Sequence, residues 1–176
     1  MRQIVTLIFL TLALIAAPKE AKMRLLSPAF EHGGFIPAKY TCDGADISVP
    51  LIFQNVPASA KSLALIMDDP DAPMGVFVHW VIYDMPPTLQ GLPEAVPNTP
   101  ELEYGIKQGY NDFGNIGYGG PCPPNGAHRY FFKLYALSAD LELKPGLTKA
   151  QLLTIITPYI ISEAVLMGVY ERQIVP

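Results

Sequence analysis

The residues best suited to chemistry in this sequence are aspartates and histidines that stand beside stiff, proline-rich turns. Asp69 and Asp71 lie in the segment DDPDAPMG, and His79 follows it. His128 and Tyr130 follow a second stiff segment, GGPCPPNG. Two imidazoles, a tyrosine hydroxyl and the amides of a glycine loop are donors for a phosphate-like anion. These residues predict an anion-binding pocket, in which Asp69 orients an imidazole and Asp71 bonds backbone amides and holds the turn.

Three other chemistries fit these residues less well. Covalent catalysis needs a positioned nucleophile, but there is no G-x-S-x-G motif, and Cys122, between two prolines, suits a structural role better. Zinc binding is not supported by any close H-x-H or H-E-x-x-H spacing, so we expect no metal. Asp69 and Asp71 would be the carboxylates of a glycosidase, but in a turn they should diverge. A hydrolase or transferase that uses His79 and His128 stays an alternative, with no catalytic residue assigned.

The composition describes one turn-rich globular domain. Of 176 residues, 50% are hydrophobic and 16% are charged, so the chain can bury a sizeable core. The 18 prolines and 14 glycines favour a mainly β architecture over a helix bundle. A net charge of -4 without a cluster of Lys and Arg argues against nucleic acid and anionic membrane surfaces as partners. We expect no cofactor.

Three segments with the pattern of strands position the chemistry-bearing residues. Residues 62–67 form a short apolar run ending in acids, which fits a buried strand. Residues 128–137 predict another strand, with its histidine and tyrosine on a shared face. Residues 77–83 predict a central strand, because both of its faces are apolar. One of those faces is expected to carry Phe77, His79, Val81 and Tyr83.

The remaining elements complete a sheet and add a late helix. Residues 47–53 predict a strand, and Pro50 suggests that it lies at an edge or contains a bulge. A helix is expected to begin after Thr148, because Gln151 completes a capping-box pattern there. Residues 164–170 predict a strand that closes the sheet.

The N-terminus has the layout of an export signal. Arg2 precedes a nearly continuous apolar run that is too short for a comfortable membrane span. We therefore predict a leader in residues 1–22 and a single domain in residues 23–176, exported to the periplasm or secreted and not inserted in the membrane after the leader is removed. If Met23 is the true start, the protein would instead be cytoplasmic.

Several motifs resemble those of the phosphatidylethanolamine-binding protein family, which is also called the Raf kinase inhibitor protein family. These are DPDAP at residues 69–73 with the following His79, and GGPCPP…HRY at residues 119–130. The segments TCDGADIS, QGYNDFG and GYGGPCPPNG are similar to those of the bacterial branch. The resemblance extends from about Ser27 to Arg172.

The resemblance implies a fold of two antiparallel sheets with Greek-key connections and helical structure late in the chain. It also implies an anion pocket at one end of the fold, able to take a phosphoryl headgroup. By motif position, its residues are Asp69, Pro73, His79, Gly120, His128 and Tyr130, with Asp71 supporting the turn. A cis peptide before Pro70 or Pro73 is a further expectation. Cys42 and Cys122 could form one disulfide.

These observations favour a small-ligand-binding protein whose pocket takes a phosphoryl or carboxyl group and which modulates a protein partner. One alternative is an inhibitor of a protease or kinase that acts through a surface loop in residues 86–100; the hydrolase or transferase is the other. The loop before His128 is short, and no counterpart of the aromatic lid of some eukaryotic members is evident. Neither full-lipid binding nor kinase inhibition is therefore carried over from the resemblance.

Overall fold

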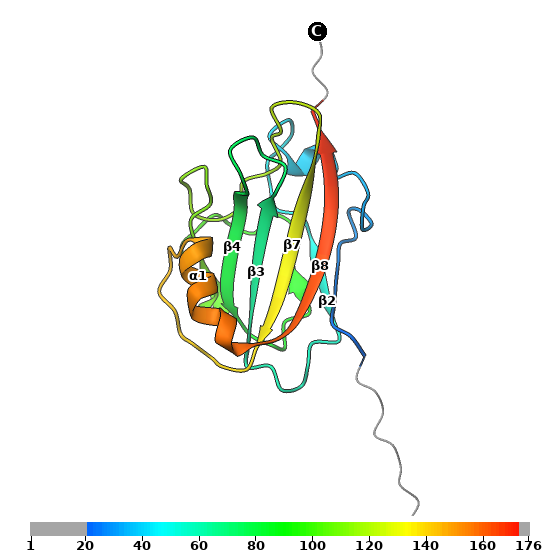
Figure 1. Cartoon of the computed structure of the whole chain (residues 1–176). Coiled ribbons are helices and arrows are strands. Elements are labelled where there is room, and N and C mark those ends of the chain that lie inside the picture. The colour runs from blue at the N-terminus through cyan, green and yellow to red at the C-terminus, as the bar shows by residue number, and fades with distance from the viewer. Residues whose placement is uncertain (1–20, 173–176) are drawn as a thin grey trace, which may run out of the picture.

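Two antiparallel sheets dominate the structure, a computed structural model that describes residues 21–172 (Figure 1). The larger sheet has the strand order β6-β4-β3-β7-β8. The smaller sheet has the order β1-β2-β5. The larger sheet comprises β3 (Ser62–Asp69), β4 (Phe77–Met85), β6 (Lys107–Gln108), β7 (Ala127–Leu137) and β8 (Ile160–Glu171). The smaller comprises β1 (Arg24–Leu26), β2 (Leu51–Gln54) and β5 (Gly91–Leu92). The predicted mainly β fold is confirmed.

The connection between β4 and β7 brings distant parts of the chain together. After pairing with β3, β4 leads into β5 and β6, and β7 then pairs with β3 on the side opposite β4. Because β3 runs antiparallel to both neighbours, its C-terminal end meets the N-terminal ends of β4 and β7. This arrangement gathers three strand ends, and the turns that flank them, at one end of the sheet.

The predicted late helix is present and packs on one face of the larger sheet (Figure 1). α1 (Lys149–Ile156) begins after Thr148, whose side chain accepts from the Gln151 backbone N–H, while the Gln151 side chain reaches back to the cap. Three 3-10 helices, η1 (Ala38–Tyr40), η2 (Glu103–Gly105) and η3 (Thr157–Tyr159), complete the helical content of residues 21–172. Within those residues no helix is long and apolar enough to cross a membrane. Residues 1–20 of the predicted leader lie outside the described part of the chain.

The larger sheet separates two hydrophobic cores. Alternate residues of β3 point to opposite faces, so Leu65 and Met67 join the core between the sheets, while Ala64 and Ile66 join the core beneath α1. The same alternation sends Asp69 towards the first face and Asp68 towards the second.

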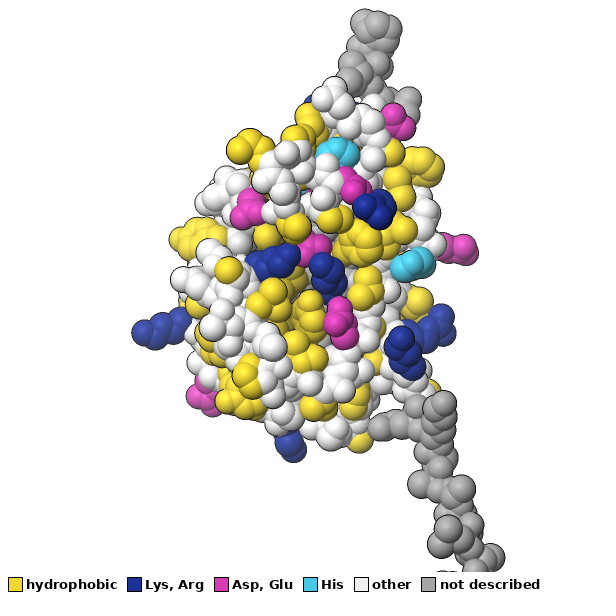
Figure 2. Space-filling view, in the orientation of Figure 1, with side chains coloured by type: hydrophobic (Ala, Val, Ile, Leu, Met, Phe, Trp, Pro, Cys, Tyr) yellow, Lys and Arg dark blue, Asp and Glu magenta, His cyan; other side chains and the backbone are white. Residues whose placement is uncertain are grey.

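Charged side chains lie among apolar ones over β3, β7 and β8 on the face shown in Figure 2.

An irregularity in β4 overturns the predicted face assignment of this strand. Met67 pairs with Trp80 but Asp68 pairs with Val78, so His79 is an extra residue in the ladder. As a result Val78 joins Val81 in the core beneath α1, while the His79 ring packs against Tyr130 on the other side. Strict alternation from Phe77 to Tyr83 was therefore wrong. The bulge turns the imidazole towards the end of the sheet.

Pro50 does not make its strand an edge strand. β2 begins at Leu51, directly after the proline, and lies between β1 and β5 in the smaller sheet. Pro50 precedes the ladder, so its missing N–H removes no hydrogen bond from either partner strand.

Candidate anion-binding site

A cavity of about 620 Å³ opens where β3 ends and β4 and β7 begin. Asp69 is the last residue of β3, and His128 is the second residue of β7. The cavity wall contains five of the predicted site residues: Asp69, Pro73, His79, His128 and Tyr130. The structure thus places together residues that lie up to 61 positions apart in the sequence.

His128 and Asp69 form a buried hydrogen-bonded pair. The His128 Nδ1 and Asp69 Oδ2 atoms are 2.7 Å apart, and the two side chains are 9% and 4% exposed. The other carboxylate oxygen of Asp69 accepts the Asp71 N–H at 2.7 Å. A carboxylate only accepts hydrogen bonds, so the His128 proton at this contact sits on Nδ1. Nε2 is left as the second hydrogen-bonding atom of the ring.

His79 is fixed in the same way, but by a backbone carbonyl. Its Nδ1 lies 2.7 Å from the Gly119 oxygen, so this nitrogen also carries the proton. The ring is 3% exposed and makes edge contacts with Phe113 and Tyr130. Burial lowers the pKa of His79, against smaller opposing effects from the Gly119 carbonyl and the Asp69 charge. At neutral pH His79 is therefore neutral, which makes its Nε2 a hydrogen-bond acceptor.

The Tyr130 hydroxyl is the one buried side-chain polar atom without a hydrogen-bond partner within residues 21–172. The whole residue is 0% exposed, and it lines the cavity. Burial raises the pKa of Tyr130 far above its ordinary value, the Asp69 charge acts in the same direction, and the nearby Cys122 backbone N–H, outside good hydrogen-bond geometry, opposes both. The hydroxyl is thus a protonated donor at neutral pH. Buried hydroxyls are nearly always paired, so an unpaired one in a cavity wall is available to hydrogen-bond a molecule that enters the cavity.

Asp71 and Gly120, also predicted to bind ligand, do not line this cavity. Asp71 faces Arg129, with Oδ1 2.6 Å from Nη2 and Oδ2 3.0 Å from the backbone N–H. The hydrogen bonds from Arg129 lower the pKa of Asp71 to about 2. Gly120 donates its N–H to Asp46 Oδ1 at 2.7 Å. Both residues support the walls of the cavity, and the Asp71 carboxylate joins the turn to Arg129 in β7.

The peptide bonds before Pro70 and Pro73 are trans. There is no cis peptide bond within the described residues, so the expectation of one in this turn was wrong. The turn is instead held by the Asp69 carboxylate and by the ion pair between Asp71 and Arg129.

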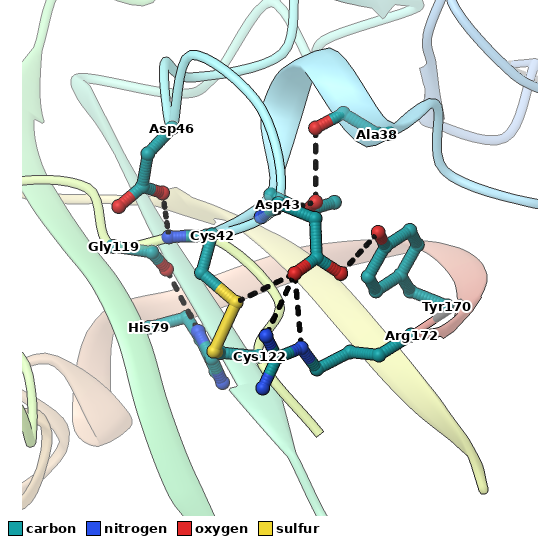
Figure 3. Close-up of a disulfide and its surroundings, with 11 residues drawn as sticks. Ala38, Cys42, Asp43, Asp46, His79, Gly119, Cys122, Tyr170 and Arg172 are labelled. Carbon is teal, nitrogen blue, oxygen red and sulfur yellow. Dashed lines mark hydrogen bonds and ion pairs between the residues drawn. A yellow bond between two sulfur atoms is a disulfide. The ribbon is translucent and has the colours of Figure 1, made fainter. Parts of the chain in front are cut away.

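A disulfide joins Cys42 to Cys122 beside the cavity (Figure 3). Cys122 and Pro123 belong to the cavity wall, which makes the bridge part of the site's support. Asp43, next to Cys42, accepts hydrogen bonds from Tyr170 at 2.8 Å and from Arg172 at 3.0 Å (Figure 3). The resemblance marked the segment TCDGADIS, which contains Cys42, but did not reveal that this segment lies beside the pocket.

Several supporting residues were missed because their partners are distant in the sequence. Asp112 Oδ2 accepts the Val78 N–H at 2.7 Å and so holds the start of β4. Phe113, 46% exposed, covers one side of the His79 ring. Both lie in QGYNDFG, a motif that the resemblance had marked without assigning it a role. The presence of that motif was the one signal in the sequence that could have indicated these supporting residues.

A second cleft, of about 600 Å³, lies at the opposite ends of β3 and β4. It is lined by charges of both signs, including Asp84, Lys107 and Glu142. Lys107 already pairs with Glu101. Within residues 21–172 no three His, Cys, Asp or Glu side chains are arranged to hold a metal ion. The cavity at His79 and His128 is therefore the better candidate, because it combines buried polar groups with an unpaired hydroxyl.

The sequence of the chain matches a known protein family. A family model described as phosphatidylethanolamine-binding protein matches residues 26–171. A UPF0098 protein of Methanothermobacter thermautotrophicus is 53% identical over 150 residues, which cover 85% of this chain and 99% of that protein. A UPF0098 protein of Aquifex aeolicus is 50% identical over 156 residues, which cover 87% and 91% of the two chains.

Two solved structures share the fold. The crystal structure of a phosphatidylethanolamine-binding protein homolog from Chlamydia trachomatis has a TM-score of 0.80 and 44% identity, covering 86% of this chain and 99% of that one. Escherichia coli YbcL, described as a member of the mammalian family, has a TM-score of 0.80 and 30% identity, covering 87% and 100%. The chain belongs to the phosphatidylethanolamine-binding protein family.

Proposed function

We propose that the protein binds a small anion through a phosphoryl or carboxyl group in the cavity between His79 and His128. The observation that carries this proposal is the buried Tyr130 hydroxyl, which has no hydrogen-bond partner in the described part of the chain and lines the cavity beside both imidazoles. A hydroxyl and two rings fixed through Nδ1 leave three hydrogen-bonding atoms for one ligand. A phosphoryl group has enough oxygens to meet all three.

The protonation of the site makes binding depend on pH. A neutral His79 presents a lone pair at Nε2, which repels an anionic oxygen but accepts from a ligand O–H. A phosphate ester near its second pKa of about 6 has such a hydroxyl. Otherwise His79 must take up a proton, against the effect of burial. In either case the complex holds a proton between ligand and ring, so affinity rises as pH falls towards 6.

The rim of the cavity favours an anion that carries a small apolar or neutral group. Met74 is 100% exposed and Val76 is 53% exposed, and both line the cavity. The Pro73 side of the mouth therefore adds no charge that would compete for the anion. A phosphate monoester with a short alkyl group meets both requirements. Phosphoethanolamine, whose ammonium group is charged at neutral pH, tests whether this rim accepts a cation.

Neither alternative function gains a specific observation. Residues 86–100, the segment considered for an inhibitory loop, include β5, which pairs with β2, and the buried Val96. Cys122, considered as a nucleophile, is bonded to Cys42. The modulation of a protein partner also has no supporting contact, so the proposal is restricted to ligand binding.

The proposal is tested by calorimetric titration with inorganic phosphate and with phosphoethanolamine between pH 6 and pH 8. We expect affinity to rise as pH falls, and a binding enthalpy that changes with the ionisation enthalpy of the buffer, because a proton is taken up. His79→Ala should weaken binding at least about tenfold, the loss of one charge-assisted hydrogen bond. His32→Ala is the matched control, since His32 is exposed and outside the cavity. Absence of binding, or equal loss in both variants, would refute the proposal.

A further inference from the structure

Two segments of the chain, residues 40–46 and residues 118–122, are fastened together beside the anion pocket. Together their contacts form what we call the clamp. Three are hydrogen bonds: Tyr118 Oη to the Tyr40 oxygen at 2.7 Å, the Gly120 N–H to Asp46 Oδ1 at 2.7 Å, and the Cys42 N–H to the Pro121 oxygen at 3.1 Å. The fourth is the disulfide between Cys42 and Cys122 (Figure 3).

The clamp holds the residue that orients His79. Gly119 lies inside the second segment, and its carbonyl accepts from His79 Nδ1 at 2.7 Å (Figure 3). The Gly119 N–H donates back to the His79 carbonyl at 2.9 Å. A Cβ at Gly119 would lie only 2.6 Å from the Phe113 ring, so the backbone is packed closely against the pocket. Any shift of this segment therefore moves the acceptor that fixes the His79 ring.

The other half of the site does not depend on the clamp. His128 is fixed by Asp69, and these residues belong to β7 and β3, which pair along seven residues of each strand. The paired residues of that ladder, 62–68 and 131–137, take no part in the contacts of the clamp. Loss of the clamp should thus affect the two histidines unequally.

The disulfide is open to chemical reduction. Cys42 is exposed, and Cys122 is half-buried. A thiolate of a dithiol attacks the Cys42 sulfur, the Cys42–Cys122 bond breaks, and Cys122 leaves as a thiolate that takes up a proton. The second thiol of the reductant then displaces Cys42, which also gains a proton. The protein receives two electrons and two protons, and the dithiol becomes its own cyclic disulfide.

We propose that the Cys42–Cys122 disulfide is a redox-sensitive positioning element for His79, and that its reduction by a dithiol weakens anion binding. The second part rests on the proposed function. Three hydrogen bonds of the clamp remain after reduction, so the fold persists while the 118–122 segment gains freedom. The signature of this device is an effect on His79 without an equal effect on His128.

The test follows the histidine ring NMR signals of the ligand-free protein before and after addition of dithiothreitol. We expect the His79 signals to shift or broaden, while the signals of His128 and of exposed His32 stay in place. Reduction should also weaken phosphate binding about tenfold, and reoxidation should restore it. An unchanged His79, or equal changes at His79 and His128, would overturn the proposal.

A variant separates the bridge from side effects of the reductant. Cys42→Ser/Cys122→Ser should show the His79 signals of the reduced protein and give no response to dithiothreitol. If this variant does not fold, the reduced and reoxidised natural chain decides the question. If the oxidised protein fails to bind phosphate, the proposed function is wrong, and the predicted effect of reduction on affinity is wrong as well. The positioning role is then judged by His79 in the ligand-free protein alone.

Discussion

Replacing Tyr130 by Phe should separate ligand binding from stability. The change removes only the hydroxyl, which is buried and has no protein partner within residues 21–172. An ordinary buried hydrogen bond contributes about 1 kcal/mol to stability, and a buried group without one is destabilising by about 1–3 kcal/mol. Because the hydroxyl stands at a cavity wall, we expect the free energy of unfolding to stay constant or to rise by up to about 1 kcal/mol. The affinity for phosphate should fall about tenfold, or about 1.4 kcal/mol.

Tyr83 provides the matched control. It is also 0% exposed, but its hydroxyl donates to the Lys144 carbonyl at 2.7 Å and accepts from the Leu147 N–H at 3.2 Å. Tyr83→Phe should therefore lower stability by about 1–2 kcal/mol and leave phosphate affinity unchanged. Urea unfolding and calorimetric titration measure the two quantities. A Tyr130→Phe protein that loses as much stability as Tyr83→Phe, or that keeps full affinity, would refute the reasoning.

Three further predictions concern charged groups outside the cavity. Burial raises the pKa of Asp84 to about 6, so its charge destabilises the fold increasingly as pH rises from about 4 to 6. Asp84→Asn, which keeps an acceptor for the Leu143 N–H, should therefore raise the free energy of unfolding by about 2–3 kcal/mol at pH 7 and leave it unchanged at pH 3. Equal gains at both pH values would contradict this. The pKa of Asp71 is lowered to about 2, so its pairing with Arg129 stabilises the fold above about pH 4, and this stabilisation is lost as pH falls towards 2. After discounting for partial exposure, Asp71→Asn should lower the free energy of unfolding by about 1 kcal/mol at pH 7 and by almost nothing at pH 2, as measured by thermal unfolding. Asp68, 1% exposed and paired with two lysines, lies on the face of the sheet away from the cavity. Asp68→Asn should lower the free energy of unfolding by about 2–3 kcal/mol and leave phosphate affinity unchanged. A changed affinity would contradict the separation of the two faces.

The strands and the helix that carry the site could be predicted because their signals are local. The apolar run before Asp69 marks β3, and the alternation after His128 marks β7. The pairing of Thr148 with Gln151 marks the start of α1. Each of these signals depends on neighbours a few residues away, so no knowledge of the tertiary structure was needed.

The parts of the site that could not be predicted depend on contacts between distant segments. The bulge at His79 arises from the register between β3 and β4, which the alternation within β4 alone does not reveal. Gly120 was expected in the pocket, but its N–H is taken by Asp46, 74 residues away. Gly119 fixes His79 through its backbone carbonyl, and a contact made by the backbone cannot be inferred from the type of the residue.

The most direct test of the account is a phosphate titration of the oxidised protein followed through the ring signals of its three histidines. The account predicts that His79 and His128 respond together, with one shared dissociation constant, while exposed His32 does not move. His128→Ala should abolish the response at His79. If the ring signals of His79 and His128 do not shift, or if His128→Ala binds phosphate as strongly as the natural chain, the claim that these residues form one anion site is contradicted.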